Sequence, residues 1–177
     1  SKKAVDKYKM TCTFVMGTKE LYEWIHYNPV CASYPADICN DPKRVASNDK
    51  MIAINNALEV DLTGQISSES IGFTPISGPG GQLDFSIGAF NSRGGKSFIC
   101  LSSTTKDKDG NRVSRIVPYF RPGTVVDVPR TFADFIVTEY GAVTLKGRPT
   151  WARAEKLISI AHQIGRASCR ERVYACV

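Results

Sequence analysis

The sequence has 177 residues and a formal net charge of +6, with 42% hydrophobic and 23% charged residues. These values are typical of one globular domain and exclude a disordered chain or a fibrous repeat. No apolar run reaches the roughly 18 residues that a membrane span requires, and the N-terminal SKKAVDKYKM lacks the apolar core of a secretory signal. We therefore expect a cytoplasmic protein without a membrane partner, or a mitochondrial one if its source is eukaryotic.

The N-terminal part of the chain predicts a strand followed by a helix. Residues Met10–Met16 are apolar and rich in β-branched side chains, and Gly17 ends the run. Thr18 is a candidate N-cap for the helix that follows, which Asn28-Pro29 would end. Three apolar residues are expected on one face of this helix: Leu21, Trp24 and Ile25.

The centre of the chain predicts extended segments around a glycine-rich loop. A short helix is expected to begin at Asn40-Asp41-Pro42, because proline fits the first turn of a helix. Residues Met51–Leu62 indicate an extended segment that Asn55 and Asn56 interrupt, since asparagine is a poor strand former. After the loop SGPGG, a second helix is expected from Gln82.

The C-terminal half of the chain predicts several strands and a final helix. A hairpin is expected over Lys106–Arg112 with Asp-Gly at its tip. Thr150 is a candidate N-cap of a helix that ends near Gln163. Four further strands are expected at Lys96–Leu101, Val113–Phe120, Thr124–Val128 and Phe132–Thr138, and four helix residues are expected on one apolar face: Trp151, Leu157, Ile158 and Ala161. The whole pattern predicts one α/β domain with a mixed sheet flanked by helices.

The last fourteen residues, 164–177, differ in character from the domain expected over residues 1–163. The helical pattern stops there, and arginine and cysteine gather without apolar periodicity. The stretch IGRASCRERV closely resembles the translation of a common sequencing-library adapter, so we expect a non-native tail fused to a truncated gene. A natural basic tail is the alternative. Without this segment the net charge falls to +4, which weakens the case for an anionic partner.

The cysteines do not indicate a metal site. Cys169 and Cys176 lie in the suspect tail, and the four others form no CxxC pair and are accompanied by only two histidines. These four are expected to be reduced thiols: Cys12, Cys31, Cys39 and Cys100. Cys100 lies in an apolar run, so an inert buried thiol is favoured over a nucleophile. Basic residues are dispersed and are not interleaved with aromatic ones, which argues against a nucleic-acid partner.

The glycine-rich loop Ser77–Gly81 is the strongest candidate for a functional site. Its backbone amides are not shielded by side chains, and the helix expected from Gln82 would add the positive end of its dipole at the same place. Such amides suit a phosphate or a developing oxyanion. The alternative is that the glycines serve only to turn the chain.

Several segments appear in one order that resembles a known family. They are NDP, NNALEVDLTGQISSESIG, SGPGGQLDFSIGAF, GGKS, SSTT, SRIVP, VTEYGAVTLKG and LISIAH. From about Lys9 to His162 the chain resembles the C-terminal half of the acetyl-CoA hydrolase/transferase family, particularly its 4-hydroxybutyrate and butyrate-type CoA-transferases. The resemblance implies the second domain of a two-domain enzyme, with an N-terminal domain of the same chain as its partner.

The resemblance also implies a mechanism and substrates. In the family a glutamate attacks an acyl-CoA thioester, and ping-pong exchange continues through a glutamyl-CoA thioester that a short carboxylic acid resolves. That glutamate would lie upstream of Ser1, so this chain alone is expected to be inactive. Coenzyme A is implied as part of the substrate, no metal is implied, and a homo-oligomer is among the expected assemblies. Whether a carboxylate or water resolves the intermediate stays open.

Four residues near the loop match family positions. The resemblance implies that amides of Gly80 and Gly81 hold the thioester oxyanion, with Gly81 also contacting the cofactor. Ser77 heads the loop and is a candidate CoA contact, although some relatives carry asparagine there. Asn40 falls where the family has an asparagine near the reacting carboxylate. The alternative for Asn40 is that it caps the turn that follows it.

Residues farther along the chain match as well. Glu139 is implied to lie close to the active-site cleft, with a salt-bridged structural carboxylate as the alternative. Lys106 and Lys108 fall in a loop where relatives bind CoA phosphates or the pantetheine arm through a lysine, against the alternative of solvated hairpin charges. Arg115 could brace the domain interface, and His162 is expected to have a structural role at the helix end. A rival class for the whole chain is a non-catalytic α/β module that binds an anion through the glycine loop.

Overall fold

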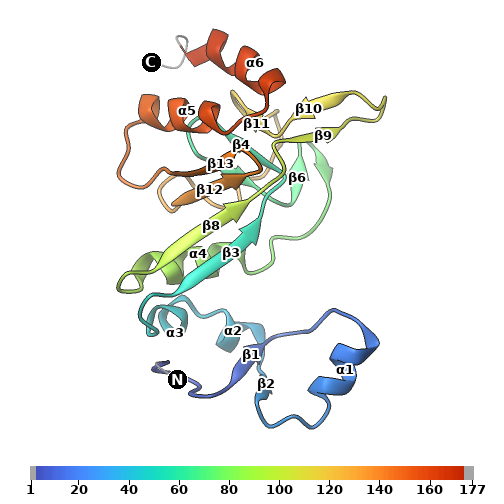
Figure 1. Ribbon diagram of the computed structural model, residues 1–177, viewed down its shortest axis with the longest axis vertical. Helices are drawn as coiled ribbons and strands as arrows, with labels where there is room; N and C mark the ends of the chain where they lie inside the picture. The colour runs from blue at the N-terminus through green and yellow to red at the C-terminus, as the bar shows by residue number, and fades with distance from the viewer. Residues whose placement is uncertain (1–2, 174–177) are drawn as a thin grey trace.

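The computed structural model describes residues 3–173, which form six helices and thirteen short strands (Figure 1). The helices are α1 (Lys19–Ile25), α2 (Ala36–Cys39), α3 (Pro42–Ala46), α4 (Gln82–Asn91), α5 (Thr150–Ser159) and α6 (Gln163–Val173). The strands are β1 (Met10–Cys12), β2 (Cys31–Ser33), β3 (Ile52–Asn56), β4 (Glu59–Asp61), β5 (Ile66–Ser67), β6 (Ser70–Ile71), β7 (Thr74–Pro75), β8 (Lys96–Cys100), β9 (Thr104–Lys106), β10 (Arg112–Ser114), β11 (Ile116–Val117), β12 (Phe135–Thr138) and β13 (Gly141–Thr144).

A mixed four-stranded sheet forms the centre of the domain, as the sequence predicts. Its order is β13-β12-β8-β3, in which β3, β8 and β12 are parallel and β13 is antiparallel to β12. β3 is therefore an edge strand. The expected segment Met51–Leu62 divides into β3 and β4, and the asparagines lie at the carboxyl end of β3.

The helices that pack on this sheet cover one of its faces. Ile99 and Ile136 are paired in register, are fully buried, and belong to the core cluster that includes Leu157 of α5. The side chains of Phe98 and Phe135, one residue earlier on the same strands, stack on the opposite face at 4.8 Å between ring centroids and are half-buried. The expected flanking by helices is thus one-sided within residues 3–173.

The N-terminal β1–α1–β2 unit has no interior of its own. β1 and β2 pair in parallel through the connection that contains α1, and the Thr18 hydroxyl accepts a hydrogen bond from the Leu21 amide, so the predicted N-cap is confirmed. No residue from 3 to 44 is buried, and the predicted apolar face of α1 packs against nothing that buries it. The expected strand Met10–Met16 ends early, at Cys12.

The remaining strands form small sheets beside the central one. β9 and β10 make the predicted hairpin, with Gly110 at a φ of +83° near its tip. β4 pairs with β5 and β11, and β6 pairs with β7. The predicted strand Thr124–Val128 is wrong, because the segment contributes one isolated bridge, from Val128 to Ile66.

The helix α5 begins one residue earlier than predicted and presents a different face. Its N-cap is Pro149, and Thr150 is the first helical residue. Leu157 is fully buried while Trp151 is 53% exposed, so Trp151 does not share the apolar face as predicted. The helix ends at Ser159, which leaves the buried Ala161 outside it.

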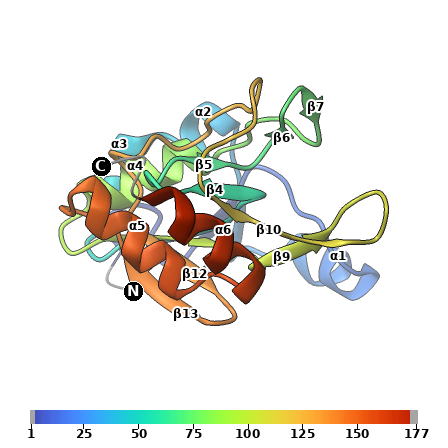
Figure 2. The same ribbon diagram turned by 90° about the horizontal axis from the view of Figure 1, so that it is seen from above.

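The C-terminal segment forms a further helix where the sequence pattern predicted an end to helical structure. α6 lies beside α5, as Figure 2 shows. The thiol of Cys169 is buried and donates to the carbonyl oxygen of Ile116 at 3.8 Å, and burial raises its pKa to about 11. The non-native origin of residues 164–177 stays a prediction, and 174–177, with Cys176, lie outside the described residues. Among the helices described, none has the length and apolar character needed to span a bilayer.

Candidate functional site

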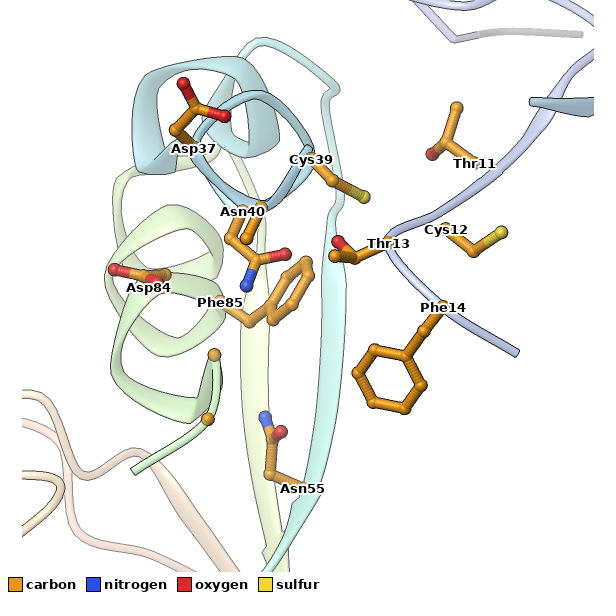
Figure 3. A pocket seen from close by; sticks show the side chains of 13 residues that line it. Thr11, Cys12, Thr13, Phe14, Asp37, Cys39, Asn40, Asn55, Asp84 and Phe85 are labelled. Carbon is orange, nitrogen blue, oxygen red and sulfur yellow. The ribbon is translucent and has the colours of Figure 1, made fainter. Parts of the chain in front are cut away.

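A cavity of about 630 Å³ opens between the N-terminal unit and the start of α4 (Figure 3). Three separate parts of the chain form its walls: residues 11–14 at the end of β1 and just beyond it, the helix α2 with Asn40, and Asn55 near the end of β3. Gly80 and Gly81 complete the lining at the N-terminus of α4. The sequence-predicted trio of Gly80, Gly81 and Asn40 is therefore brought to one cavity.

The glycine loop leaves its amides unused. Within residues 3–173 no hydrogen bond engages the N–H of Gly80 or Gly81, whereas the Gly81 carbonyl accepts from the Phe85 amide at 3.1 Å and so begins α4. Gly80 has a φ of +58°, a conformation that side chains disfavour. The first amides of a ten-residue helix have no partner within the helix and carry a partial positive charge. The loop therefore offers free donors at the cavity wall.

Gly81 and Asn40 fit closely against one another. A Cβ atom added to Gly81 would lie 2.4 Å from Asn40 Nδ2 and 3.2 Å from a ring carbon of Phe85. Real Cβ atoms do not approach other atoms to such a distance, so this position requires glycine while Asn40 keeps its place. The side-chain amide of Asn40 is thereby held next to the loop.

Asn40 does not cap the helix that follows it, so that alternative is wrong. The N-cap of α3 is Asp41, whose carboxylate accepts a hydrogen bond from the Lys43 amide at 3.0 Å. Asn40 instead ends α2, with its backbone amide donating to Ala36 at 2.8 Å. Its side chain is free for a different task in the cavity.

Two further polar groups at the cavity were not assigned a role from the sequence. Asn55 Nδ2 and Thr13 Oγ1 are buried atoms that have no hydrogen-bond partner in the described part of the chain, and both residues line the cavity. A buried donor without a partner costs about 1–3 kcal/mol, so such groups point to an absent partner. The interruption of an apolar strand by Asn55 was the available signal, whereas Thr13 gave none.

Two carboxylates also line the cavity. Asp84 lies in the first turn of α4, and Asp37 lies in the first turn of α2. Both are placed where the helix dipole favours a negative charge. Their negative charges lower the positive potential of the cavity. Binding of an anion there would therefore depend more on hydrogen bonds from the glycine-loop amides than on net charge.

Glu139 lies in a separate, shallower hollow of about 300 Å³ at the carboxyl ends of the parallel strands. Its carboxylate accepts from the hydroxyl of Ser103 at 2.6 Å and from the amide of Ser103 at 2.9 Å. These two bonds hold the pKa of Glu139 below its ordinary value. No salt bridge to Glu139 is formed within residues 3–173, so the alternative of a salt-bridged carboxylate is wrong. Asn56 lines this hollow while its neighbour Asn55 lines the larger cavity.

The other predicted contacts lie away from the glycine cavity. The hydroxyl of Ser77 donates to backbone carbonyl groups of Ser68 and Gly78 and does not line the cavity. Lys106 and Lys108 are exposed on the β9–β10 hairpin, which Figure 1 shows well apart from α2 and β1. The structure thus brings together three of the seven predicted site residues and leaves four outside that cavity.

The free thiols include two at the cavity, Cys12 and Cys39, while Cys100 is half-buried beside Glu139. Cys100 was expected to be an inert buried thiol, and the structure buries it only in part. Across residues 3–173, no group of three or more His, Cys, Asp and Glu side chains is arranged to hold a metal ion.

Comparison with known proteins identifies relatives of the whole chain. Residues 17–173 match the family model described as the acetyl-CoA hydrolase/transferase C-terminal domain. A butyryl-CoA:acetate CoA-transferase of Anaerostipes caccae is 53% identical over 162 residues, which are 92% of this chain and 36% of that protein. The crystal structure of RipA from Yersinia pestis superposes with a TM-score of 0.88 at 39% identity, over 99% of this chain and 39% of that one.

A crystal structure of 4-hydroxybutyrate CoA-transferase from Porphyromonas gingivalis has a TM-score of 0.77 at 36% identity, again over 99% of this chain and 39% of that one. The chain therefore spans little more than a third of the length of the relatives it matches.

Proposed function

The chain belongs to the acetyl-CoA hydrolase/transferase family, and on that premise we propose that it is the C-terminal part of an acyl-CoA:carboxylate CoA-transferase. Its substrates would be an acyl-CoA and a short carboxylic acid. The observation that carries the proposal is the pair of unused amides at Gly80 and Gly81 on the wall of a cavity, with the Asn40 side chain against them.

The proposed reaction needs a donor site for an oxyanion. A glutamate from the preceding part of the polypeptide attacks the thioester carbonyl carbon, the C–S bond breaks, and CoA leaves as thiolate with an acyl-glutamyl anhydride formed. The thiolate then attacks the glutamyl carbonyl carbon and releases the acyl group as a carboxylate. The incoming carboxylate attacks the resulting glutamyl-CoA thioester, and the same two steps in reverse transfer CoA to it.

Gly81 would act at each of these additions. Its amide would donate to the carbonyl oxygen as negative charge develops there, with Gly80 beside it, and no proton needs to move. The N-terminus of α4 would favour that charge further. Asn40 would donate its side-chain amide to the glutamate and hold the carboxylate for attack.

The remaining predicted residues would have supporting roles. Glu139, ionised and fixed by Ser103, would border the cleft without acting as the nucleophile. Lys106 and Lys108 would reach CoA phosphates only if the nucleotide end of CoA extends to the hairpin. Ser77 would shape the loop through its backbone contacts.

The test compares this chain with the polypeptide extended to include the part that precedes residue 1. The extended protein should exchange CoA between butyryl-CoA and acetate, whereas residues 1–177 alone should show no exchange. Incubation with acyl-CoA should give a protein adduct of the mass of CoA less one water, located by peptide mass spectrometry on a glutamate. A folded extended protein that binds acyl-CoA with neither exchange nor adduct would instead support the non-catalytic binding module.

The role of the loop has a matched control within four residues. In the extended protein, Gly81→Ala should lower kcat by about 100-fold or more, because the new methyl group displaces Asn40 and the loop amide. Gly78→Ala should leave kcat nearly unchanged, since nothing lies within 4 Å of its Cβ position. Equal losses from both variants would contradict an oxyanion role for Gly81.

A further inference from the structure

A groove runs between β1 and β3, two strands that do not pair with each other. The 630 Å³ cavity is continued by a second one of about 360 Å³, and the two share Thr11, Cys39 and Phe85 in their walls. Ile52, at the start of β3, lines the second cavity, and Asn55, near the end of the same strand, lines the first. In Figure 3 the chain from Thr11 to Phe14 descends on one side of this groove while β3 descends to Asn55 on the other, so both walls run in the same direction.

The wall formed by β3 has an unused backbone edge. The carbonyl of Met51 accepts from Lys96 of β8, and the amide of Ala57 donates to Cys100 of the same strand. Because backbone groups alternate in direction along a strand, those of Ile52 and Ile54 point away from β8. Their amides make no hydrogen bond within residues 3–173, and the two residues are 48% and 70% exposed.

The wall formed by β1 has the same property. The amide of Met10 donates to Val30 and the carbonyl of Cys12 accepts from Tyr34, so the even-numbered residues face β2. By the same alternation, the backbone groups of Thr11 and Thr13 face away from β2, on the side of the groove. Both edges that border the groove therefore have free donors and acceptors in parallel orientation.

We propose that the groove is the seat of one further β-strand, which pairs in parallel with β1 on one side and with β3 on the other. This strand would join the two-stranded sheet and the four-stranded sheet into one continuous sheet. A two-stranded sheet is marginal by itself, and unpaired edges attract other chains, so an inserted strand removes both defects. The groove is floored by the apolar ring of Phe85, which suits the side chains of a buried strand.

The occupant is a strand from the part of the polypeptide that precedes residue 1. A parallel strand that leads into its neighbour needs a crossover of about a dozen residues or more, and residues 3–9 are too few to supply it. The relatives have ample length outside the matched region, since this chain spans 36% of one of them. A second copy of the chain fits less well, because its own free edges are the walls of its own groove.

The direction of the inserted strand fixes where it ends. A strand parallel to both walls has its carboxyl end beside Asn55, Phe14 and the glycine loop. The unpartnered atoms Asn55 Nδ2 and Thr13 Oγ1 lie along this route and would gain partners there. The residue that follows the strand would face Gly81. Only the additional claim that this residue is the nucleophilic glutamate rests on the proposed function.

Hydrogen exchange followed by NMR tests the strand directly. In residues 1–177 alone, the amides of Thr11, Thr13, Ile52 and Ile54 should exchange nearly unprotected, while the control amide of Ala53, which faces β8 in the four-stranded sheet, should be protected. In the extended polypeptide the four groove amides should exchange at least 100-fold more slowly. The proposal would be overturned if the groove amides stayed unprotected in a folded extended protein. It would also be overturned if these amides were protected in residues 1–177 in a concentration-dependent way, because that would indicate a dimer.

A proline substitution provides a second, independent readout. Proline is tolerated on a sheet edge, where no hydrogen bond is lost, and not in a central strand. Relative to Ile54→Ala, Ile54→Pro should lower the Tm of the extended protein by more than about 5 °C beyond its effect on residues 1–177. Equal effects in the two proteins would overturn the proposal. These outcomes are separate from CoA exchange. A protein without CoA exchange can still show the inserted strand, and a protein with CoA exchange can lack it.

Discussion

Two regions of the molecule use similar apolar residues with opposite results. In the core region, residues 45–161, alternating strands and the helix α5 bury isoleucine, valine and leucine side chains completely. In the N-terminal region, residues 3–44, large apolar side chains remain exposed, among them Phe14 at 74% and Tyr27 at 93%. A correct local pattern of strand, cap and helix therefore does not by itself create an interior.

The two regions are joined mainly by polar contacts. The side-chain oxygen of Asn48 accepts hydrogen bonds from the amide of Ala4 at 2.8 Å and from the amide of Val5 at 3.4 Å. Apolar packing begins only at Val45, the first buried residue of the chain, which contacts Gly88 of α4. The contrast indicates that the N-terminal region lacks the segment on which its apolar residues would pack, in agreement with a strand seated between β1 and β3.

The largest expected effect compares one residue type in both settings. In residues 1–177, Ile136→Ala should lower the free energy of unfolding by about 3 kcal/mol, because Ile136 is fully buried and leaves a cavity. Ile54→Ala, at a position that is 70% exposed, should change it by less than about 0.5 kcal/mol. Urea unfolding measures both. Losses of similar size for the two variants would show that the β3 edge is covered in solution, and would contradict the contrast between a buried and an exposed isoleucine.

The contact between α3 and α4, at the N-terminal boundary of the core region, should show a smaller loss. A Cβ atom on Gly88 would lie 2.4 Å from Cγ1 of Val45, so Gly88→Ala should destabilise the chain by about 2 kcal/mol through overpacking. Because Cβ of Val45 is itself 2.5 Å from the same position, the space is vacated only when residue 45 also loses its Cβ, so the double variant Val45→Gly/Gly88→Ala should recover part of that loss. Non-additivity in a urea-unfolding cycle measures the contact. Strict additivity would mean that α3 does not pack on α4 as described.

The buried carboxyl of Glu59 in the core region should respond to pH. Burial raises its pKa above the ordinary 4.5, against the opposing charges of Arg121 and Arg115, so between pH 4.5 and the raised pKa the folded state holds a proton that the unfolded state has lost. Its contribution to stability is present below pH 4.5 and is lost as the pH rises through the folded pKa. Glu59→Gln should therefore stabilise the protein by roughly 1 kcal/mol at pH 7, and the difference should vanish at low pH. Thermal unfolding across this range would contradict the assignment if the difference grew on acidification.

The smallest effect on stability is expected for α1, which buries no residue. Thr18→Ala removes the cap of α1 and should destabilise that helix by about 0.5–1 kcal/mol. Because α1 buries no residue, the global Tm should not move, and the change should appear only as faster exchange of the amides in α1. Thr18→Ser should restore the exchange rates. A fall in the global Tm would contradict this expectation and would show that α1 unfolds together with the core region.

Local rules explain the parts of the fold that the sequence predicted. The Thr18 cap, the Asp-Gly hairpin and the start of α4 after Gly81 each depend on backbone preferences within a few residues. The strand predicted at Thr124–Val128 and the face predicted for Trp151 were wrong because both depend on which distant neighbour is present. Periodicity indicates an apolar side and does not say whether a partner covers it.

The candidate site divides in the same way. By itself the sequence determined the glycine loop at a helix start and the order of motifs that indicates the family, because both are encoded in contiguous residues. Only the tertiary structure decided that Asn40 fits against Gly81, that Asn55 and Thr13 share their cavity, and that Ser77, Glu139 and the two hairpin lysines lie elsewhere. Those contacts join segments far apart in the chain, and their distances are set by how the sheet and helices pack, which no local pattern specifies.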